Sequence, residues 1–251
     1  MLISLRNSAF QIVLHHMRAK KFSSYKTMIF DCDGVILNSN KLKTNAFKSV
    51  AMPFGQAAAD AFEDYHIANG GLSRYEKFHY FLEKILPTYG ESSALGPKNV
   101  IRIEDLLHTF AAHIHMGLKT CEIAPGLDDL RNLSSDTDWM MVSGSDQREL
   151  RQVLRYRGIA NYFQAGIFGS PDNKDTILWR ELQSGKIVHP AIYIGDSVND
   201  FQSAQRADID FIFVSGWSEV RDWQTFVLAN QIKSVESMLD LTSLLTRFDL
   251  I

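Results

Sequence analysis

The chain has 251 residues, of which 45% are hydrophobic and 22% charged, a composition typical of a globular protein with a sizeable core. A formal net charge of −3 argues against a nucleic-acid partner, because no overall basic field would attract one. The absence of any run of 18 apolar residues excludes a membrane-spanning helix, and two cysteines, Cys32 and Cys121, without metal-ligand spacing favour a reduced, cytoplasmic protein.

Residues 1–25 differ from the rest of the chain, because they contain four basic residues and no acidic one. An acid-poor, basic start is also a feature of transit peptides, but the apolar pieces here are short and broken. We therefore interpret residues 1–25 as an N-terminal extension, either a helix or tail or the product of a start codon placed too early.

The first predicted strand is the apolar run Thr27–Phe30, which leads directly into Asp31-Cys32-Asp33-Gly34. A period of two places the side chains of Asp31 and Asp33 on the same face. Two carboxylates in one crevice repel each other unless a cation or a proton lies between them. The pair therefore indicates a metal or acid–base site, although a surface turn would also use aspartate and glycine.

About a hundred residues separate this strand from the next one, which is too many for a single crossover helix. The pattern in between predicts an inserted, all-helical segment at residues 39–122, which we call the cap. Its predicted helices are Lys41–Ala51, Gln56–Ala68, Tyr75–Leu86 and Ile101–Leu118. Gly70-Gly71 precedes a basic helix start within the cap, where Arg74 and Lys77 share one face. Arg74 is our candidate for a substrate contact there, and a solvated helix end is the alternative.

After Pro125-Gly126 the chain alternates between strands and helices. The predicted strands are Trp139–Val142, Ala165–Phe168, Ala191–Ile194 and Phe211–Val214. The predicted helices are Leu127–Leu133, Gln147–Tyr156, Lys174–Gln183, Val198–Arg206 and Ser218–Leu228. This alternation predicts a Rossmann-like α/β core in which a parallel sheet is covered on both faces, with ligands bound beyond the carboxyl ends of its strands.

Polar residues follow three of these later strands. Ser143-Gly144 offers a hydroxyl and free backbone N–H groups to a phosphate, and Lys174 opens a helix although the helix dipole disfavours a cation there. Asp196 and Asp200 add two carboxylates, so that four would meet in one crevice and require a hard cation such as Mg²⁺. Taken singly, Ser143 could be a helix N-cap, as could Asp196 or its neighbour Ser197, and Lys174 could be solvated.

Together these segments resemble the four motifs of the haloacid dehalogenase-like hydrolase superfamily. Asp31-Cys32-Asp33-Gly34-Val35 is similar to the first motif, Ser143 to the second, Lys174 to the third and Gly195–Asp200 to the fourth. The helical insert resembles the cap of the β-phosphoglucomutase-like branch, and the resemblance covers nearly all of the chain from Lys26 onward. It implies a core at residues 26–38 and 123–251 with a cap at residues 39–122.

The resemblance also implies a mechanism. Asp31 would be the nucleophile that forms an aspartyl-phosphate, and Asp33 the general acid and base. Mg²⁺ would be held by Asp31, the backbone carbonyl of Asp33 and Asp196, with Asp200 nearby, while Ser143 and Lys174 would stabilise the phosphoryl group.

We therefore expect a Mg²⁺-dependent phosphatase that acts on a small phosphorylated metabolite, such as a sugar phosphate, without nucleic acid, membrane or obligate protein partner. A phosphomutase, which returns the phosphoryl group to its substrate, is the alternative enzyme. A non-catalytic binding protein on the same fold is the alternative class, but it would have no need of a nucleophile and an acid together.

Overall fold

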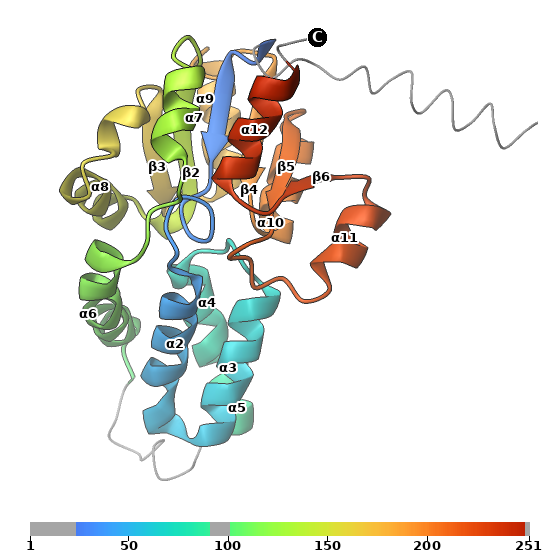
Figure 1. Ribbon diagram of the computed structural model, residues 1–251. Coiled ribbons are helices and arrows are strands. Elements are labelled where there is room, and N and C mark those ends of the chain that lie inside the picture. The colour runs from blue at the N-terminus through green and yellow to red at the C-terminus, as the bar shows by residue number, and fades with distance from the viewer. Residues whose placement is uncertain (1–23, 91–100, 249–251) are drawn as a thin grey trace, which may run out of the picture.

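The computed structural model describes residues 24–90 and 101–248, so nearly all of the predicted N-terminal extension lies outside the described residues. Figure 1 shows a sheet with flanking helices in the upper part of the molecule and the helices α2 to α6 below it. The fold class expected from the sequence, a parallel-sheet core with a helical cap inserted after the first strand, is confirmed. Within the described residues, no helix has the length and apolar character needed to cross a bilayer.

The sheet has six parallel strands in the order β3-β2-β1-β4-β5-β6. Its strands are β1 (Thr27–Phe30), β2 (Asp138–Asp146), β3 (Gly166–Ser170), β4 (Ala191–Gly195), β5 (Asp210–Val214) and β6 (Lys233–Val235). The register places Ile29 of β1 between Met140 of β2 and Tyr193 of β4. Because the strand order reverses at β1, the crevice for a ligand lies where β1, β2 and β4 end.

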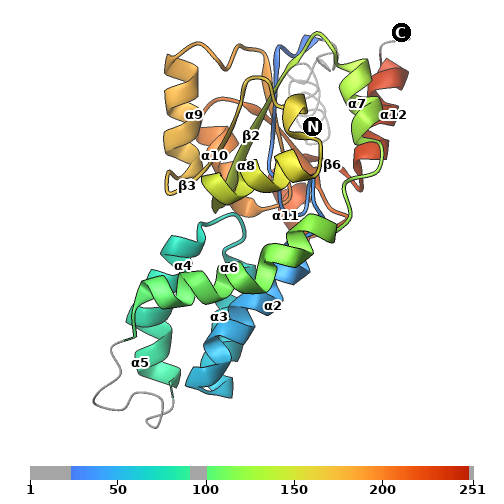
Figure 2. The ribbon, with the colours of Figure 1, turned by 90° about the vertical axis from the view of Figure 1, so that its left-hand side faces the viewer.

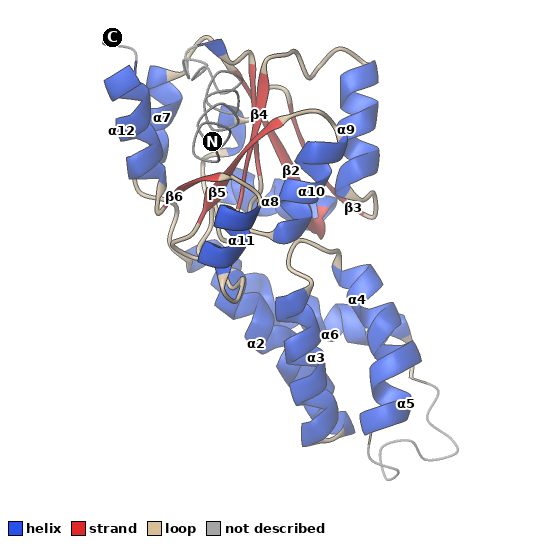
Figure 3. Cartoon of the chain, turned by 90° about the vertical axis from the view of Figure 1, so that its right-hand side faces the viewer, coloured by secondary structure: helices blue, strands red, loops and turns tan. Residues whose placement is uncertain are grey.

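Alternate residues of β1 enter two different hydrophobic clusters, as the two-residue period of a strand requires. Met28 and Phe30 join the cluster that includes side chains of α7, α8 and α12, whereas Ile29 joins the cluster formed with α9 and α10. Figure 3 shows α7 and α12 on one side of the strands and α9 and α10 on the other. These helices are α7 (Leu127–Leu133), α8 (Gln147–Tyr156), α9 (Lys174–Gln183), α10 (Val198–Arg206) and α12 (Met238–Phe248). The first strand is therefore buried on both faces and fixes the loop that follows it.

The cap consists of α2 (Asn40–Ala51), α3 (Gln56–Ala68), α4 (Arg74–Tyr80), α5 (Leu86–Tyr89) and α6 (Ile103–Thr120). In Figure 2, α6 runs along these helices towards the sheet. Their common core is aromatic: the ring of Phe47 lies 4.2–5.4 Å from the rings of Phe62, Phe78 and Phe110, measured between centroids. These aromatic side chains hold the cap helices together and set the position of the polar groups at their sheet-facing ends.

Several element boundaries differ from the expected ones. The expected helix over residues 75–86 is interrupted by a π-helical turn at Phe81–Ile85, and β2 continues to Asp146 instead of ending at Val142. Helix α11 begins at Trp223 because Asp222, which precedes it, has a left-handed backbone conformation with φ of 52°. Strand β6 and helix α12 were not predicted. The division of the chain into domains at residues 38/39 and 122/123 stays a prediction.

Candidate active site

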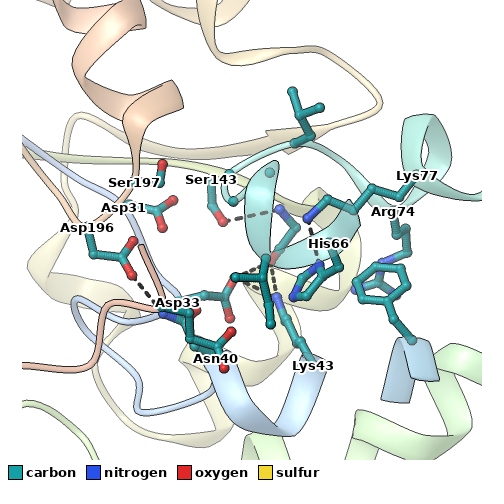
Figure 4. Close-up of a pocket in the computed structure, with 18 of the residues that line it drawn as sticks. Asp31, Asp33, Asn40, Lys43, His66, Arg74, Lys77, Ser143, Asp196 and Ser197 are labelled. Carbon is teal, nitrogen blue, oxygen red and sulfur yellow. Dashed lines mark hydrogen bonds and ion pairs between the residues drawn. The ribbon is translucent and has the colours of Figure 1, made fainter. Parts of the chain in front are cut away.

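The candidate site lies at the carboxyl ends of the strands, where the cap faces the sheet (Figure 4). Asp31 follows β1 directly, Asp196 follows β4, and Asp200 lies in the first turn of α10. Their carboxylate oxygens lie within 4.8 Å of one another, and all three side chains are buried. The topology thus brings together three acidic residues that are up to 169 positions apart in the sequence.

Burial and mutual repulsion determine the electrostatics of this acidic cluster. Burial raises the pKa of Asp31 to about 7 against the opposing charge of Lys174, and burial together with Asp31 and Asp200 raises the pKa of Asp196 well above its usual value. The ammonium group of Lys174 lies 2.8 Å from Asp31 Oδ1 and also pairs with Asp200. One ammonium group does not neutralise three carboxylates, and an oxygen-only cluster suits Mg²⁺, so these residues fit such an ion.

Asp33 has separate surroundings. Its carboxylate accepts hydrogen bonds from Ser39 (2.6 Å) and Ser145 (2.7 Å), and it forms an ion pair with Lys43 of the cap helix α2. Burial alone would raise the pKa of Asp33, but Lys43 and these hydrogen bonds outweigh it and lower the pKa to about 2. The two aspartates of the first motif therefore have opposite pKa shifts, that of Asp31 being raised by burial and that of Asp33 lowered by its contacts.

The loop after Asp33 is held against Asp196. Gly34 has a φ of 77°, and a β-carbon at this position would overlap with Asp196 and with the side chain of Asn40. The Asn40 amide donates to Asp196 Oδ2 (2.7 Å) and to the backbone carbonyl of Trp217 (2.8 Å). Gly34 thus permits the close approach that brings the loops after β1 and β4 together.

Ser143 and Gly144 lie inside the irregular end of β2, in a region where the pairing with β3 shifts register. The Ser143 side chain is 1% exposed and accepts a hydrogen bond from the backbone N–H of Ser145 (3.1 Å). A β-carbon on Gly144 would overlap with the backbone carbonyl of Gly71 in the cap. The Gly70-Gly71 turn therefore bends towards the core and lies against the phosphate-binding candidates Ser143 and Gly144.

Helix α4 is attached to the amino-terminal end of α8 by two contacts. Arg74 forms a two-pronged ion pair with Glu149, and its guanidinium group lies 4.8 Å from the centre of the Phe110 ring. The Tyr75 hydroxyl donates to Asp146 Oδ2 (2.8 Å). Arg74 lines the cavity, as its predicted substrate contact requires, but its charge already has a partner.

Lys77, one turn further along α4, has different surroundings. Its side chain is fully buried, and its ammonium nitrogen lies 2.7 Å from Nδ1 of His66 in α3. Burial, with the nearby charge of Lys43, lowers the pKa of Lys77 from 10.5 to about 7. Burial and the two lysines also hold the pKa of His66 well below its ordinary value, so the imidazole is neutral.

The structure thus brings together all the core residues that the sequence motifs indicated: Asp31, Asp33, Ser143, Gly144, Lys174, Asp196 and Asp200. Among the four aspartates, Asp33 is the one whose side chain lies outside the acidic cluster. Its contact with a metal through the backbone carbonyl stays a prediction. Sequence reasoning missed Asn40, Lys43 and His66. Lys43 could have been found, because it shares the buried stripe of α2 with Ala46, Phe47 and Val50, where a lysine is out of place.

Comparisons with known proteins give a consistent result. A family model described as "Haloacid dehalogenase-like hydrolase" matches residues 28–214. The CbbY structure from Rhodobacter sphaeroides in complex with phosphate has a TM-score of 0.63 and 17% identity, covering 86% of this chain and 96% of that one. A putative phosphoglycolate phosphatase from Lactobacillus plantarum has a TM-score of 0.63 and 20% identity, covering 88% and 99%. Similarity at these identities shows the fold.

A curated protein also matches part of the chain. The copper-exporting P-type ATPase B of Enterococcus hirae is 34% identical over 91 residues, which is 36% of this chain. The chain spans only 11% of the length of that ATPase. The match therefore concerns a segment of a much larger protein.

Replacing Lys77 by methionine should stabilise the protein. The depressed pKa means that protonated Lys77 is a cost to the folded state, fully present below pH 7 and lost as the pH rises towards 10.5. After allowing for the hydrogen bond that His66 loses, we expect Lys77→Met to raise the free energy of unfolding by about 1–3 kcal/mol at pH 6.5 and by less at pH 9. Urea denaturation at both pH values measures this.

The half-buried Lys48, which has two carboxylate partners in Asp60 and Glu63, provides the matched control. Lys48→Met should change the free energy of unfolding by less than about 0.5 kcal/mol at either pH. A loss of stability in Lys77→Met that is the same at both pH values would contradict the assignment of Lys77 as a buried, poorly neutralised cation.

Proposed function

This chain belongs to the haloacid dehalogenase-like hydrolase family, and we propose that it is a Mg²⁺-dependent phosphatase that hydrolyses a small phosphate monoester. The observation that carries the proposal is the contrast between its two motif aspartates, which line one cavity: Asp31 belongs to a buried acidic cluster, whereas Asp33 accepts hydrogen bonds from Ser39 and Ser145. A substrate small enough to enter is indicated, because Asp31, Ser143 and Lys174 are each less than 5% exposed. We also propose that the cap belongs to the β-phosphoglucomutase-like branch.

We propose that Asp31 and Asp196 hold the metal through their carboxylates and Asp33 through its backbone carbonyl, with Asp200 at its side. When bound, Mg²⁺ neutralises the negative charge that gathers where the phosphoryl group meets these carboxylates. Lys174 and the backbone N–H groups near Ser143 and Gly144 supply further positive charge to the phosphoryl oxygens. The side chains of Asp31, Ser143, Lys174, Asp196 and Asp200 are all buried, which limits their reorganisation during the reaction.

The proposed reaction has two halves. In the first, a carboxylate oxygen of Asp31 forms a bond to phosphorus as the bond from phosphorus to the ester oxygen breaks, and Asp33 gives a proton to the departing oxygen. In the second, Asp33 takes a proton from water, the water oxygen bonds to phosphorus, and the carboxylate of Asp31 is released with inorganic phosphate. The described contacts of Asp33 stabilise its ionised form, the state that the second half requires.

We further propose that the protein acts in a reducing compartment such as the cytoplasm. The thiols of Cys32 and Cys121 are both free, as is usual in a compartment where disulfides do not persist.

Asp31→Asn should abolish turnover, because an amide does not form the acyl phosphate. We expect kcat for an aryl phosphate to fall by roughly 10³–10⁶-fold. The fold should persist, since Lys174 keeps its partner Asp200. Circular dichroism and phosphate release measure both, and metal-dependent activity near the wild-type level in the folded variant would refute the nucleophile. Analysis of sugar monophosphates for isomers during the same assays separates a phosphomutase from a phosphatase.

Asp33→Asn should have a different effect. The nucleophile remains, so an aryl phosphate with a good leaving group should still transfer its phosphoryl group to Asp31. Hydrolysis should slow by roughly 10²–10⁴-fold because no base activates water. Rapid-quench labelling should therefore show a burst of phosphoprotein. Unchanged steady-state turnover would exclude Asp33 as the acid and base.

Removal of Mg²⁺ should abolish activity, and its return should restore it. Because an ion that binds only the folded state stabilises it, saturating Mg²⁺ should also raise the free energy of unfolding by about 2–4 kcal/mol. Asp196→Asn should lose both effects, whereas Asp136→Asn, at an exposed position before the start of β2 and so away from the carboxyl ends of the strands, should keep them. Thermal denaturation with and without Mg²⁺ measures the second effect, and full activity after chelation would rule out the metal site.

Arg74→Ala should lower kcat/KM for a phosphate ester with a polar leaving group, because charge-assisted hydrogen bonds are lost. The loss of transition-state stabilisation should be about 1.5–3 kcal/mol. A small aryl phosphate should be affected much less. Glu149→Gln separates this role from a structural one, because it breaks the ion pair and leaves Arg74 in place. Equal losses on both substrates, reproduced by Glu149→Gln, would show that Arg74 only attaches the cap to the core.

A further inference from the structure

The cations that line the cavity differ in how their charge is neutralised. Lys43 is paired with Asp33, and Arg74 with Glu149. Across residues 24–90 and 101–248, Lys77 forms no ion pair, and its polar contact is to the neutral ring of His66. Among these three cations, Lys77 is therefore the one whose positive charge the protein leaves without a carboxylate.

This arrangement is unfavourable for the free protein. Lys77 is 2% exposed and its ammonium nitrogen lies 5.4 Å from the centre of the Phe47 ring, so water is largely excluded from it. A buried cation without a partner is among the most costly groups in a protein interior, and here the cost appears as a pKa lowered to about 7. An anion that reached Lys77 would relieve this cost and gain a charge-assisted hydrogen bond in surroundings of low dielectric constant.

The cavity allows such an approach. Lys77 and His66 line the same cavity as Asp31 and Ser143. Figure 4 shows Lys77 and His66 on the opposite side of this cavity from Asp31 and Asp196. A substrate whose phosphoryl group lies at Asp31 would therefore extend its other end towards Lys77.

We propose that Lys77 is the receptor for a second anionic group of the substrate, which would be a phosphomonoester with a carboxylate or another phosphate at the end away from the reacting phosphoryl group. This inference rests on the proposed phosphatase function and narrows its substrate class. The neutral His66 accepts one hydrogen bond from the ammonium group through Nδ1 and holds it in place without cancelling its charge. Arg74, already paired with Glu149, is left to hydrogen-bond uncharged parts of the substrate.

The test compares three-carbon phosphate esters that differ in one terminal group: glycerol 3-phosphate ends in a hydroxyl, 3-phosphoglycerate in a carboxylate and glycerol 1,3-bisphosphate in a phosphate. We expect the wild-type protein to prefer at least one of the anionic esters over glycerol 3-phosphate in kcat/KM by about 10- to 100-fold. Lys77→Met should lose this preference while glycerol 3-phosphate is hydrolysed at nearly the same rate. Lys48→Met, in the same cap, should behave as wild type. The better of the two anionic esters identifies the group.

Two results would overturn the proposal. One is a wild-type protein that shows no preference for either anionic ester, which needs no variant. The other is an equal loss on all three esters in Lys77→Met and in the polar, uncharged variant Lys77→Gln, which would make Lys77 structural.

Binding measurements separate this inference from the phosphatase function itself. In the Asp31→Asn background, which should not turn over, calorimetry should show tighter binding of an anionic ester than of glycerol 3-phosphate, and Lys77→Met should remove the difference. Lys77-dependent binding without turnover of any ester by the wild-type protein would refute the phosphatase and keep the anion subsite. Turnover of all three esters without Lys77-dependent selectivity would keep the phosphatase function and refute the anion subsite.

Discussion

The structure depends on the burial of several negative charges at one end of one sheet. Asp31, Asp196 and Asp200 are brought within 4.8 Å of one another although like charges repel strongly where water is excluded. Parallel strands make this possible, because β1 and β4 are neighbours and deliver their following loops to the same crevice. Lys174 enters from α9, and Ser197 forms a capping box with Asp200, so that each carboxylate is fixed by a different element. The fold therefore imposes a concentration of charge that only a cationic ligand would balance.

The cap covers the site and also contributes side chains that contact its aspartates. Its first helix contributes Asn40 to Asp196 and Lys43 to Asp33, so one aspartate of the acidic cluster and one aspartate outside it are each contacted from the cap. The position of α2 consequently affects both the acidic cluster and the surroundings of Asp33. Because Lys43 lowers the pKa of Asp33, a movement of α2 would also change the protonation of Asp33.

Much of this could be predicted from the sequence, for identifiable reasons. The first strand, and helices such as α8, α9 and α10, have the predicted bounds because apolar periodicity and polar caps mark their ends locally. The grouping of Asp31, Asp33 and Asp196 could be predicted because all three follow strands, and the carboxyl ends of neighbouring parallel strands lie at the same edge of the sheet. The last strand and helix, β6 and α12, were missed because β6 has only three residues and two of them are exposed. The cap groups were harder, because the pairing of Arg74 with Glu149 and of Lys77 with His66 depends on how helices far apart in the sequence are packed.

The contact between Gly71 and Gly144 has a consequence for how such a molecule could change. At this point cap and core meet through backbone atoms, and there is no space for even one additional carbon. This backbone contact places no demand on the cap side chains that face away from the core. Those positions could therefore change, giving a different selectivity, provided that the turn keeps its shape, both residues stay glycine and the cap side chains that contact Asp33, Asp196 and α8 are kept. A methyl group at Gly144 would overlap with the carbonyl of Gly71, so the cap and the core would have to move apart to accommodate it.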